Sequence, residues 1–185
     1  MVKNNARKYF SIVGGAHKAT GHDAFIELVN YAGEKGLDFE FALISSSNVS
    51  PFIKSLTEAG KKRLTIINKS SITDSEINEV IRQSWAVFRL DREVAQSGVV
   101  PVAYMNETPA IARDIPGLVQ HVWHEKTGYI VPFKCSPENL MAGMNYVKNN
   151  FDMLSSNARK SYEETWAEWN WEKYYSWLIK VIGGR

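Results

Sequence analysis

The stretch Tyr9-Phe-Ser-Ile-Val-Gly-Gly-Ala-His-Lys-Ala-Thr-Gly-His22 decides the fold. It opens with a short apolar run that stops at Gly14-Gly15, a pattern that predicts a buried strand leading into a tight turn. Beyond the turn, apolar residues recur at the spacing of one helix face, and Gly33 or Gly36 can end this helix through a left-handed cap. These apolar residues are Phe25, Leu28, Val29 and Ala32. The stretch therefore predicts a strand, a glycine turn and a helix in succession.

The same alternation continues along the chain. Further strands are expected over residues 39–44, 64–67, 85–90, 109–112 and 129–131. Helices are expected over residues 51–59, over 98–106, and after Thr73, which forms a capping box with Glu76. Strands that are apolar almost throughout fit a parallel sheet covered on both faces. We therefore predict an α/β fold, a Rossmann-like doubly wound sheet of about six parallel strands with helices on both faces.

The carboxyl-terminal third is predicted to be helical, within a single domain over residues 1–185. Ser136-Pro137 is an N-cap followed by a first-turn proline, and residues 153–185 form a helical tail. We expect the aromatic residues of the tail to pack it onto the domain, and an aromatic platform for a sugar is the alternative. These residues are Trp166, Trp169, Trp171, Tyr174, Tyr175 and Trp177.

Composition narrows the class of protein. The formal net charge is +2 and there is no long basic tract, so a nucleic-acid partner is not expected. The single cysteine, Cys135, cannot form an intramolecular disulfide and favours a reducing compartment, which predicts a cytoplasmic location. The amino terminus lacks the apolar core of a signal peptide, and no apolar run is long enough for a transmembrane helix.

Two loops are candidates for binding a diphosphate. In the first, Gly14 and Gly15 let the backbone approach a ligand, the following helix offers unpaired N–H groups, and Lys18 adds a cation. The second loop, Gln96-Ser97-Gly98-Val99, begins a predicted helix whose amides can hold the far end of the same diphosphate. Each loop is also compatible with an ordinary strand-to-helix turn.

Other polar groups favour structural roles. His121, His124 and Glu125 are close in sequence, but no second cluster accompanies them, so no metal is expected. The serine-rich loop over residues 45–48 is typical of a turn. Cys135 has no activating partner in sequence, which argues against a nucleophilic role.

From residue 10 to residue 182, the chain resembles the carboxyl-terminal, donor-binding domain of the group 1 family of retaining GT-B glycosyltransferases. Gln96-Ser-Gly-Val99 and the residues after it look like the branch of that family with a QSGV segment. Downstream, Ile115-Pro-Gly-Leu-Val-Gln-His121 and Glu125-Lys-Thr-Gly-Tyr-Ile-Val-Pro132 are similar to a further family motif. Trp169-Asn-Trp-Glu-Lys-Tyr-Tyr175 resembles the terminal family helix.

The resemblance implies a nucleotide-diphosphate sugar as donor, with no other cofactor and no metal. It places the phosphates at the two glycine-containing loops and the base near Asn68. Basic side chains and helix dipoles would then stabilise the leaving diphosphate. The implied function is hexosyl transfer to a glycan or lipid-linked acceptor, in polysaccharide biosynthesis, with possible peripheral membrane association of the full enzyme.

The chain departs from the family pattern in two ways. An arginine and a lysine of the family align with Gly15 and Thr20, which leaves Lys18 as the only cation expected nearby. Two family glutamates align with Val94 and Val102, and the second of them normally meets the donor ribose. These departures keep open the alternative of a non-catalytic sugar-nucleotide or carbohydrate-binding module.

The family also carries an amino-terminal domain that binds the acceptor, and none of it precedes Met1. The resemblance thus implies an excised domain or a partner-dependent half, inactive by itself. A different doubly wound enzyme, such as a sugar-nucleotide epimerase, would need catalytic groups at the strand ends, where only Asp91 and Glu93 stand.

Overall fold

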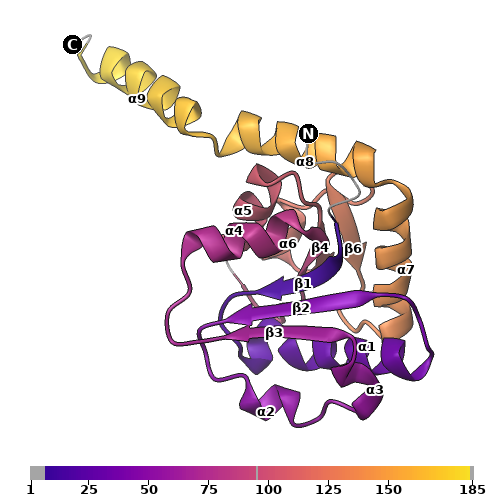
Figure 1. The fold of residues 1–185 in the computed structure, drawn as a ribbon. Helices are drawn as coiled ribbons and strands as arrows, with labels where there is room; N and C mark the ends of the chain where they lie inside the picture. Colours follow the sequence, from indigo (N-terminus) through magenta and orange to yellow (C-terminus); the bar gives the residue numbers. More distant parts are fainter. Residues whose placement is uncertain (1–6, 95, 184–185) are drawn as a thin grey trace.

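The computed structural model describes residues 7–94 and 96–183, and a six-stranded parallel sheet forms its centre (Figure 1). The strand order is β3-β2-β1-β4-β5-β6, which confirms the predicted Rossmann-like sheet. The strands are β1 (Tyr9–Val13), β2 (Glu40–Ser45), β3 (Leu64–Asn68), β4 (Ser84–Arg89), β5 (Ala110–Arg113) and β6 (Gly128–Val131).

Helices cover both faces of the sheet and give each face its own apolar core. On one face α1 and α7 pack around Phe25, Phe88 and Met144, and on the other α4, α5 and α6 pack around Ile81 and Tyr104. The helices on the first face are α1 (His22–Glu34), α2 (Ser50–Ile53), α3 (Glu58–Lys61) and α7 (Pro137–Asn149). The remaining helical segments of the described chain, on the second face or beyond the sheet, are η2 (Lys18–Thr20), α4 (Asp74–Arg82), α5 (Val99–Met105), α6 (Pro116–Val119), α8 (Phe151–Thr165) and α9 (Glu168–Gly183).

The strand order reverses direction at β1. From β1 the chain builds outward through β2 and β3, and it then returns to place β4, β5 and β6 on the other side of β1. The loops after β1 and β4 therefore diverge toward opposite faces and leave a crevice at the carboxyl ends of these strands. This crevice is where the fold favours a ligand.

The predicted helix ends are mostly present. Gly36 has φ of +64° and closes α1, with the Leu37 N–H donating to the Ala32 carbonyl at 2.9 Å. Thr73 caps α4 through the predicted capping box with Glu76. These local signals fix where the helices start and stop, and so they fix the loops that border the crevice.

The single helix predicted over residues 51–59 is wrong, because α2 and α3 are separate short helices there. The Asn30 side chain donates to the Ser55 carbonyl at 2.8 Å and accepts from the Thr57 N–H at 2.9 Å. Thr57 then caps α3 by accepting from the Gly60 N–H at 3.1 Å. These tertiary hydrogen bonds break the helix where the sequence spacing alone would continue it.

The tail divides into two parts with different packing. Trp166 packs against Tyr104 and His121, with ring centroids 6.0 and 5.3 Å apart. The aromatic side chains of α9 are instead 45–57% exposed, and α9 projects away from the sheet (Figure 1). The prediction that they pack onto the domain is therefore wrong, and those from Trp171 onward contact one another along α9. They are Trp169, Trp171, Tyr174, Tyr175 and Trp177.

Within the described residues, no helix combines the length and the apolar character needed to cross a membrane.

Candidate functional site

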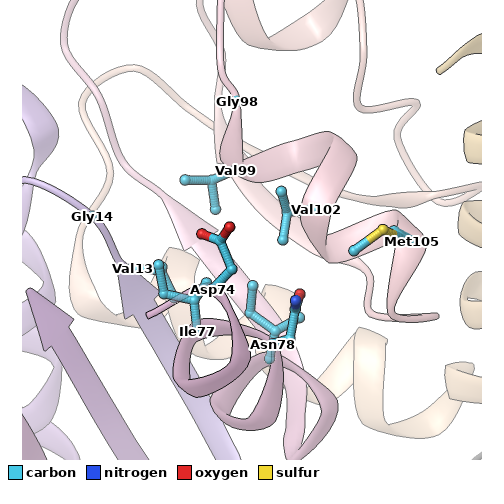
Figure 2. Close-up of a pocket in the computed structure, with 10 residues that line it drawn as sticks. Val13, Gly14, Asp74, Ile77, Asn78, Gly98, Val99, Val102 and Met105 are labelled. Carbon is cyan, nitrogen blue, oxygen red and sulfur yellow. The ribbon is translucent and has the colours of Figure 1, made fainter. Parts of the chain in front are cut away.

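A cavity of about 310 Å³ lies between α4 and α5, at the carboxyl end of β1 (Figure 2). Most of its wall is aliphatic, and its polar side chains belong to α4. Both helices begin at the end of the cavity that borders the loop after β1. The lining residues are Val13, Gly14, Asp74, Ile77, Asn78, Ile81, Gly98, Val99, Val102 and Met105.

The two predicted glycine loops meet at this cavity. A Cβ atom on Gly14 would lie 3.9 Å from Cγ2 of Val99, the first residue of α5. Gly14 has φ of +110°, which favours glycine, whereas Gly98 has φ of −68° and open space around the position of a Cβ atom. The backbone therefore does not require glycine at position 98, and Gly98 lines the cavity without a side chain.

The structure separates the remaining predicted residues of the first loop from Val102. Val102 lines the cavity, whereas Lys18 lines a separate hollow with Asp23 and Asn48. A Cβ atom on Gly15 would lie 3.5 Å from the His17 ring, and Gly15 is not among the lining residues of the cavity.

Three polar residues predicted for the site have other surroundings. The Asn68 side chain donates to the Ser45 and Ser47 carbonyls at 2.6 and 2.7 Å and so joins the loop after β2 to β3. Gln96 is exposed. Ser97 is buried, and its Oγ has no hydrogen-bond partner among the described residues.

The cavity carries an acidic group and no basic one. Figure 2 shows the Asp74 carboxylate pointing into the space beside Val13 and Val99. The Asn78 Oδ1 atom accepts from Asn106 Nδ2 at 2.7 Å. No lysine or arginine among the described residues lines this cavity. The cavity therefore suits the uncharged part of a ligand better than a bare anion.

Sequence reasoning missed a buried ion pair next to the cavity. Arg89 ends β4, and its guanidinium lies 2.9 Å from the Asp91 carboxylate and 3.5 Å from the Val13 carbonyl. The two side chains are 11% and 2% exposed. The expectation that Lys18 is the only nearby cation is therefore wrong. The sequence signal that could have revealed this pair is the presence of two charged residues, Arg89 and Asp91, at the end of an otherwise apolar strand.

Burial shifts the titration of this group of residues. Removal from water lowers the pKa of Arg89 and raises the pKa of Asp91. Burial, together with the positive charge of Arg89, lowers the pKa of His22 to about 4. The His22 Nδ1 atom lies 2.9 Å from Thr20 Oγ1, and its Nε2 atom has no partner in the described chain. His22 is therefore neutral at physiological pH.

The histidines near residue 120 have structural contacts. His121 packs on Trp166, and His124 Nδ1 accepts from the Ile130 N–H at 3.0 Å. Within residues 7–94 and 96–183, no three His, Cys, Asp or Glu side chains gather as metal ligands would.

The sheet order and the position of the cavity define a Rossmann-like domain with its crevice between β1 and β4. No protein-family model and no curated protein sequence matches the chain. Among solved structures, the chain is similar to the carboxyl-terminal domain of a group 1 family glycosyltransferase, LpcC of Francisella tularensis. The identity is 19%, the match covers 87% of each chain, and the TM-score is 0.72.

Two longer proteins give similar matches. The pneumococcal O-GlcNAc transferase GtfA, solved with UDP and GlcNAc, is 14% identical with a TM-score of 0.73, over 97% of this chain and 37% of that one. HepE of Anabaena, solved with UDP, is 12% identical with a TM-score of 0.74, over 96% of this chain and 50% of that one. The chain thus spans half or less of these two proteins, and it has the fold of one half of a GT-B structure.

Proposed function

We propose that this chain is the donor-binding domain of a glycosyltransferase and that it holds a nucleotide-diphosphate sugar. The observation that carries the proposal is the meeting of Gly14 and Gly98, from two separate strand ends, at one cavity in the β1–β4 crevice. Rossmann-like sheets bind nucleotides at this crevice, and glycines there let the phosphates approach the backbone.

The bound nucleotides of similar solved structures support the proposal. The neighbours named above include glycosyltransferases, and two of them were solved with UDP. From the sequence motifs we also propose the retaining group 1 family and its branch with the Gln96-Ser-Gly-Val99 segment.

The lining residues suggest which part of the site would contact each part of the nucleotide. The aliphatic walls formed by Ile77, Val102 and Met105 would hold the nucleoside, and the backbone near Gly14 and Gly98 would face the diphosphate. Arg89, against the Val13 carbonyl, would add positive charge as the diphosphate leaves. This division requires no metal.

The acceptor and the cellular setting are also proposals. The acceptor, a glycan or lipid-linked sugar, would bind a second domain, so we expect the 185-residue chain to transfer nothing alone. We place the reaction in cytoplasmic polysaccharide biosynthesis, with peripheral membrane association of the full enzyme. Sugar transfer by the isolated chain would contradict the assignment of a donor half.

One observation favours a non-catalytic binding module instead. Val102 gives the cavity an apolar group where the resemblance implies a ribose-binding glutamate, and Lys18 lies in another hollow. Restoring the family residues, by Val102→Glu together with Thr20→Lys, distinguishes the two functions. A large gain in nucleotide affinity would indicate a decayed site, whereas unchanged affinity would indicate that this chain binds its donor in its own way.

Calorimetric titration of the chain with UDP, GDP, ADP and CDP tests the proposal. We expect at least one to bind, and we expect Gly98→Ala to weaken it about ten-fold or more, because it adds a methyl group at a lining position where the diphosphate is proposed to meet the backbone. Gly15→Ala is the matched control, since its methyl group would face His17 and Ser47. Absence of binding by all four nucleotides, or equal effects of both variants, would refute the proposed site.

A further inference from the structure

Unpaired buried polar atoms gather at one edge of the sheet. Among the described residues, six buried side-chain nitrogen or oxygen atoms lack a hydrogen-bond partner, and five of them lie at the carboxyl ends of the strands. Buried polar groups in folded proteins are nearly always paired, so such a concentration marks a place that a further group completes. The five atoms belong to His22, Arg89, Asp91, Ser97 and Arg113.

A polar hollow of about 290 Å³ adjoins this edge, next to α1 and the loop after β6. It is separate from the cavity between α4 and α5, and the two share no lining residue. Its charged and reactive side chains are Asp23, Glu27, Arg92, Arg113, Lys134 and Cys135.

The cations of this hollow differ in how well they are paired. Arg92 forms a two-pronged ion pair with Asp23, with N–O distances of 2.6 and 3.1 Å. Arg113 is 4% exposed; its guanidinium reaches Cys135 Sγ at 3.5 Å and lies 5.7 Å from the centroid of the Phe133 ring. Neither Arg113 nor the exposed Lys134 forms an ion pair within the described residues.

The buried ion pair links the two hollows. Arg89 contacts the carbonyl of Val13, a residue that lines the cavity between α4 and α5, and Arg89 also pairs with Asp91. Asp91 in turn lies within the electrostatic reach of Arg113. Arg89, Asp91 and Arg113 together carry one net positive charge, and the hollow itself has three basic side chains against the two carboxylates of Asp23 and Glu27.

We propose that the polar hollow is an oxyanion subsite, in which Arg113 and Lys134 bind a carboxylate or phosphate group of a sugar. A guanidinium binds a planar or tetrahedral oxyanion through two parallel N–H donors, and a partly buried one is already desolvated. The volume of the hollow is larger than one acid group, which leaves room for a sugar ring. That this sugar belongs to the transfer reaction rests on the proposed function, whereas oxyanion binding itself does not.

Titrations of the intact chain with glucose, glucuronate, glucose 1-phosphate and pyrophosphate test the subsite. We expect one or more of the three anions to bind at least about ten-fold more tightly than glucose. The Nε–Hε signal of Arg113, followed by nuclear magnetic resonance, should shift on binding, because this N–H has no partner in the structure. Preference for glucuronate or glucose 1-phosphate would assign the group to an acidic sugar, and preference for pyrophosphate would assign it to a diphosphate.

Variants decide whether the named residues bind the anion. Lys134→Ala, on the exposed rim, should weaken binding about five-fold or more without unfolding the chain, whereas Lys54→Ala, an exposed lysine that does not line the hollow, should not weaken it. Arg113→Lys keeps the charge and removes the paired donors, so it should also weaken binding. Glucose binding as tightly as the anions, or equal anion binding by these variants and the original chain, would overturn the subsite. Failure of the nucleotide titrations alone would leave it standing.

Discussion

Two buried arginines, one at the amino ends of the strands and one at their carboxyl ends, have contrasting surroundings. Arg7, at the amino edge, is 6% exposed and donates to five acceptors: the carbonyls of Ile81, Ser84, Asn106 and Glu107, and Thr108 Oγ1. Arg113, at the carboxyl ends of the strands, is 4% exposed, and its guanidinium donates to the sulfur atom of Cys135 at 3.5 Å. The two arginines are thus buried to a similar extent, but Arg7 has many hydrogen-bond partners and Arg113 has few.

The difference separates a structural role from a binding role. Arg7 joins the ends of α4, β4 and the loop before β5, and its guanidinium also stacks over Phe151. Burial lowers its pKa to about 10, which still leaves it charged near neutral pH. The carboxyl edge instead keeps buried groups unpaired beside two hollows, an arrangement that costs stability and that a ligand would relieve.

Arg7→Met should have the largest effect on stability. The substitution removes a charged donor from five acceptors, four of them in buried hydrogen bonds, and we expect it to lower the free energy of unfolding by about 3–5 kcal/mol. Urea unfolding followed by circular dichroism measures the change. Arg63→Met is the control, because Arg63 pairs only with partly or fully exposed carboxylates and should cost less than about 1 kcal/mol. Equal losses in the two variants would contradict a special role for Arg7.

The next effect is a pH dependence that arises from His22. Its pKa is lowered from 6.5 to about 4 in the folded chain, so the unfolded chain binds the proton more readily. The folded state should therefore lose about 3 kcal/mol of stability as the pH falls from 6.5 to 4. Urea midpoints measured across this range should show a smaller slope in His22→Gln than in the original chain. An equal slope in the two would contradict the assignment of this pH dependence to His22.

The sequence predicted the framework of the fold well. Apolar runs such as Tyr9–Val13 mark the strands because a parallel sheet buried on both faces has no alternating pattern, and Thr73 with Glu76 marks a helix start by its own side chains. The break between α2 and α3 was missed because it depends on Asn30, which is distant in sequence. The exposure of α9 was missed because helical spacing of aromatic residues does not reveal what they face.

The candidate site was predicted only in part. Gly14 and Gly98 could be placed together because the carboxyl ends of β1 and β4 meet in any sheet of this order. Strand order does not determine where a loop side chain points. For this reason the sequence could not show that Lys18, expected beside the cavity, lines a separate hollow. Arg89, Asp91 and Arg113 were missed as a group because their proximity depends on strand register, which pairs Arg89 with Ala112 across β4 and β5.

Arg113→Met is expected to have the smallest effect on stability. Replacement of a buried, sparsely paired charge by an apolar side chain of similar length removes a desolvation cost along with few contacts, so the free energy of unfolding should change by less than about 1 kcal/mol. Urea unfolding in buffers without phosphate or sulfate measures this change beside that of Arg7→Met. A loss as large as that of Arg7→Met would show that Arg113 is structural. A small loss would support the distinction between the two ends of the strands, because it would show that folding does not depend on Arg113.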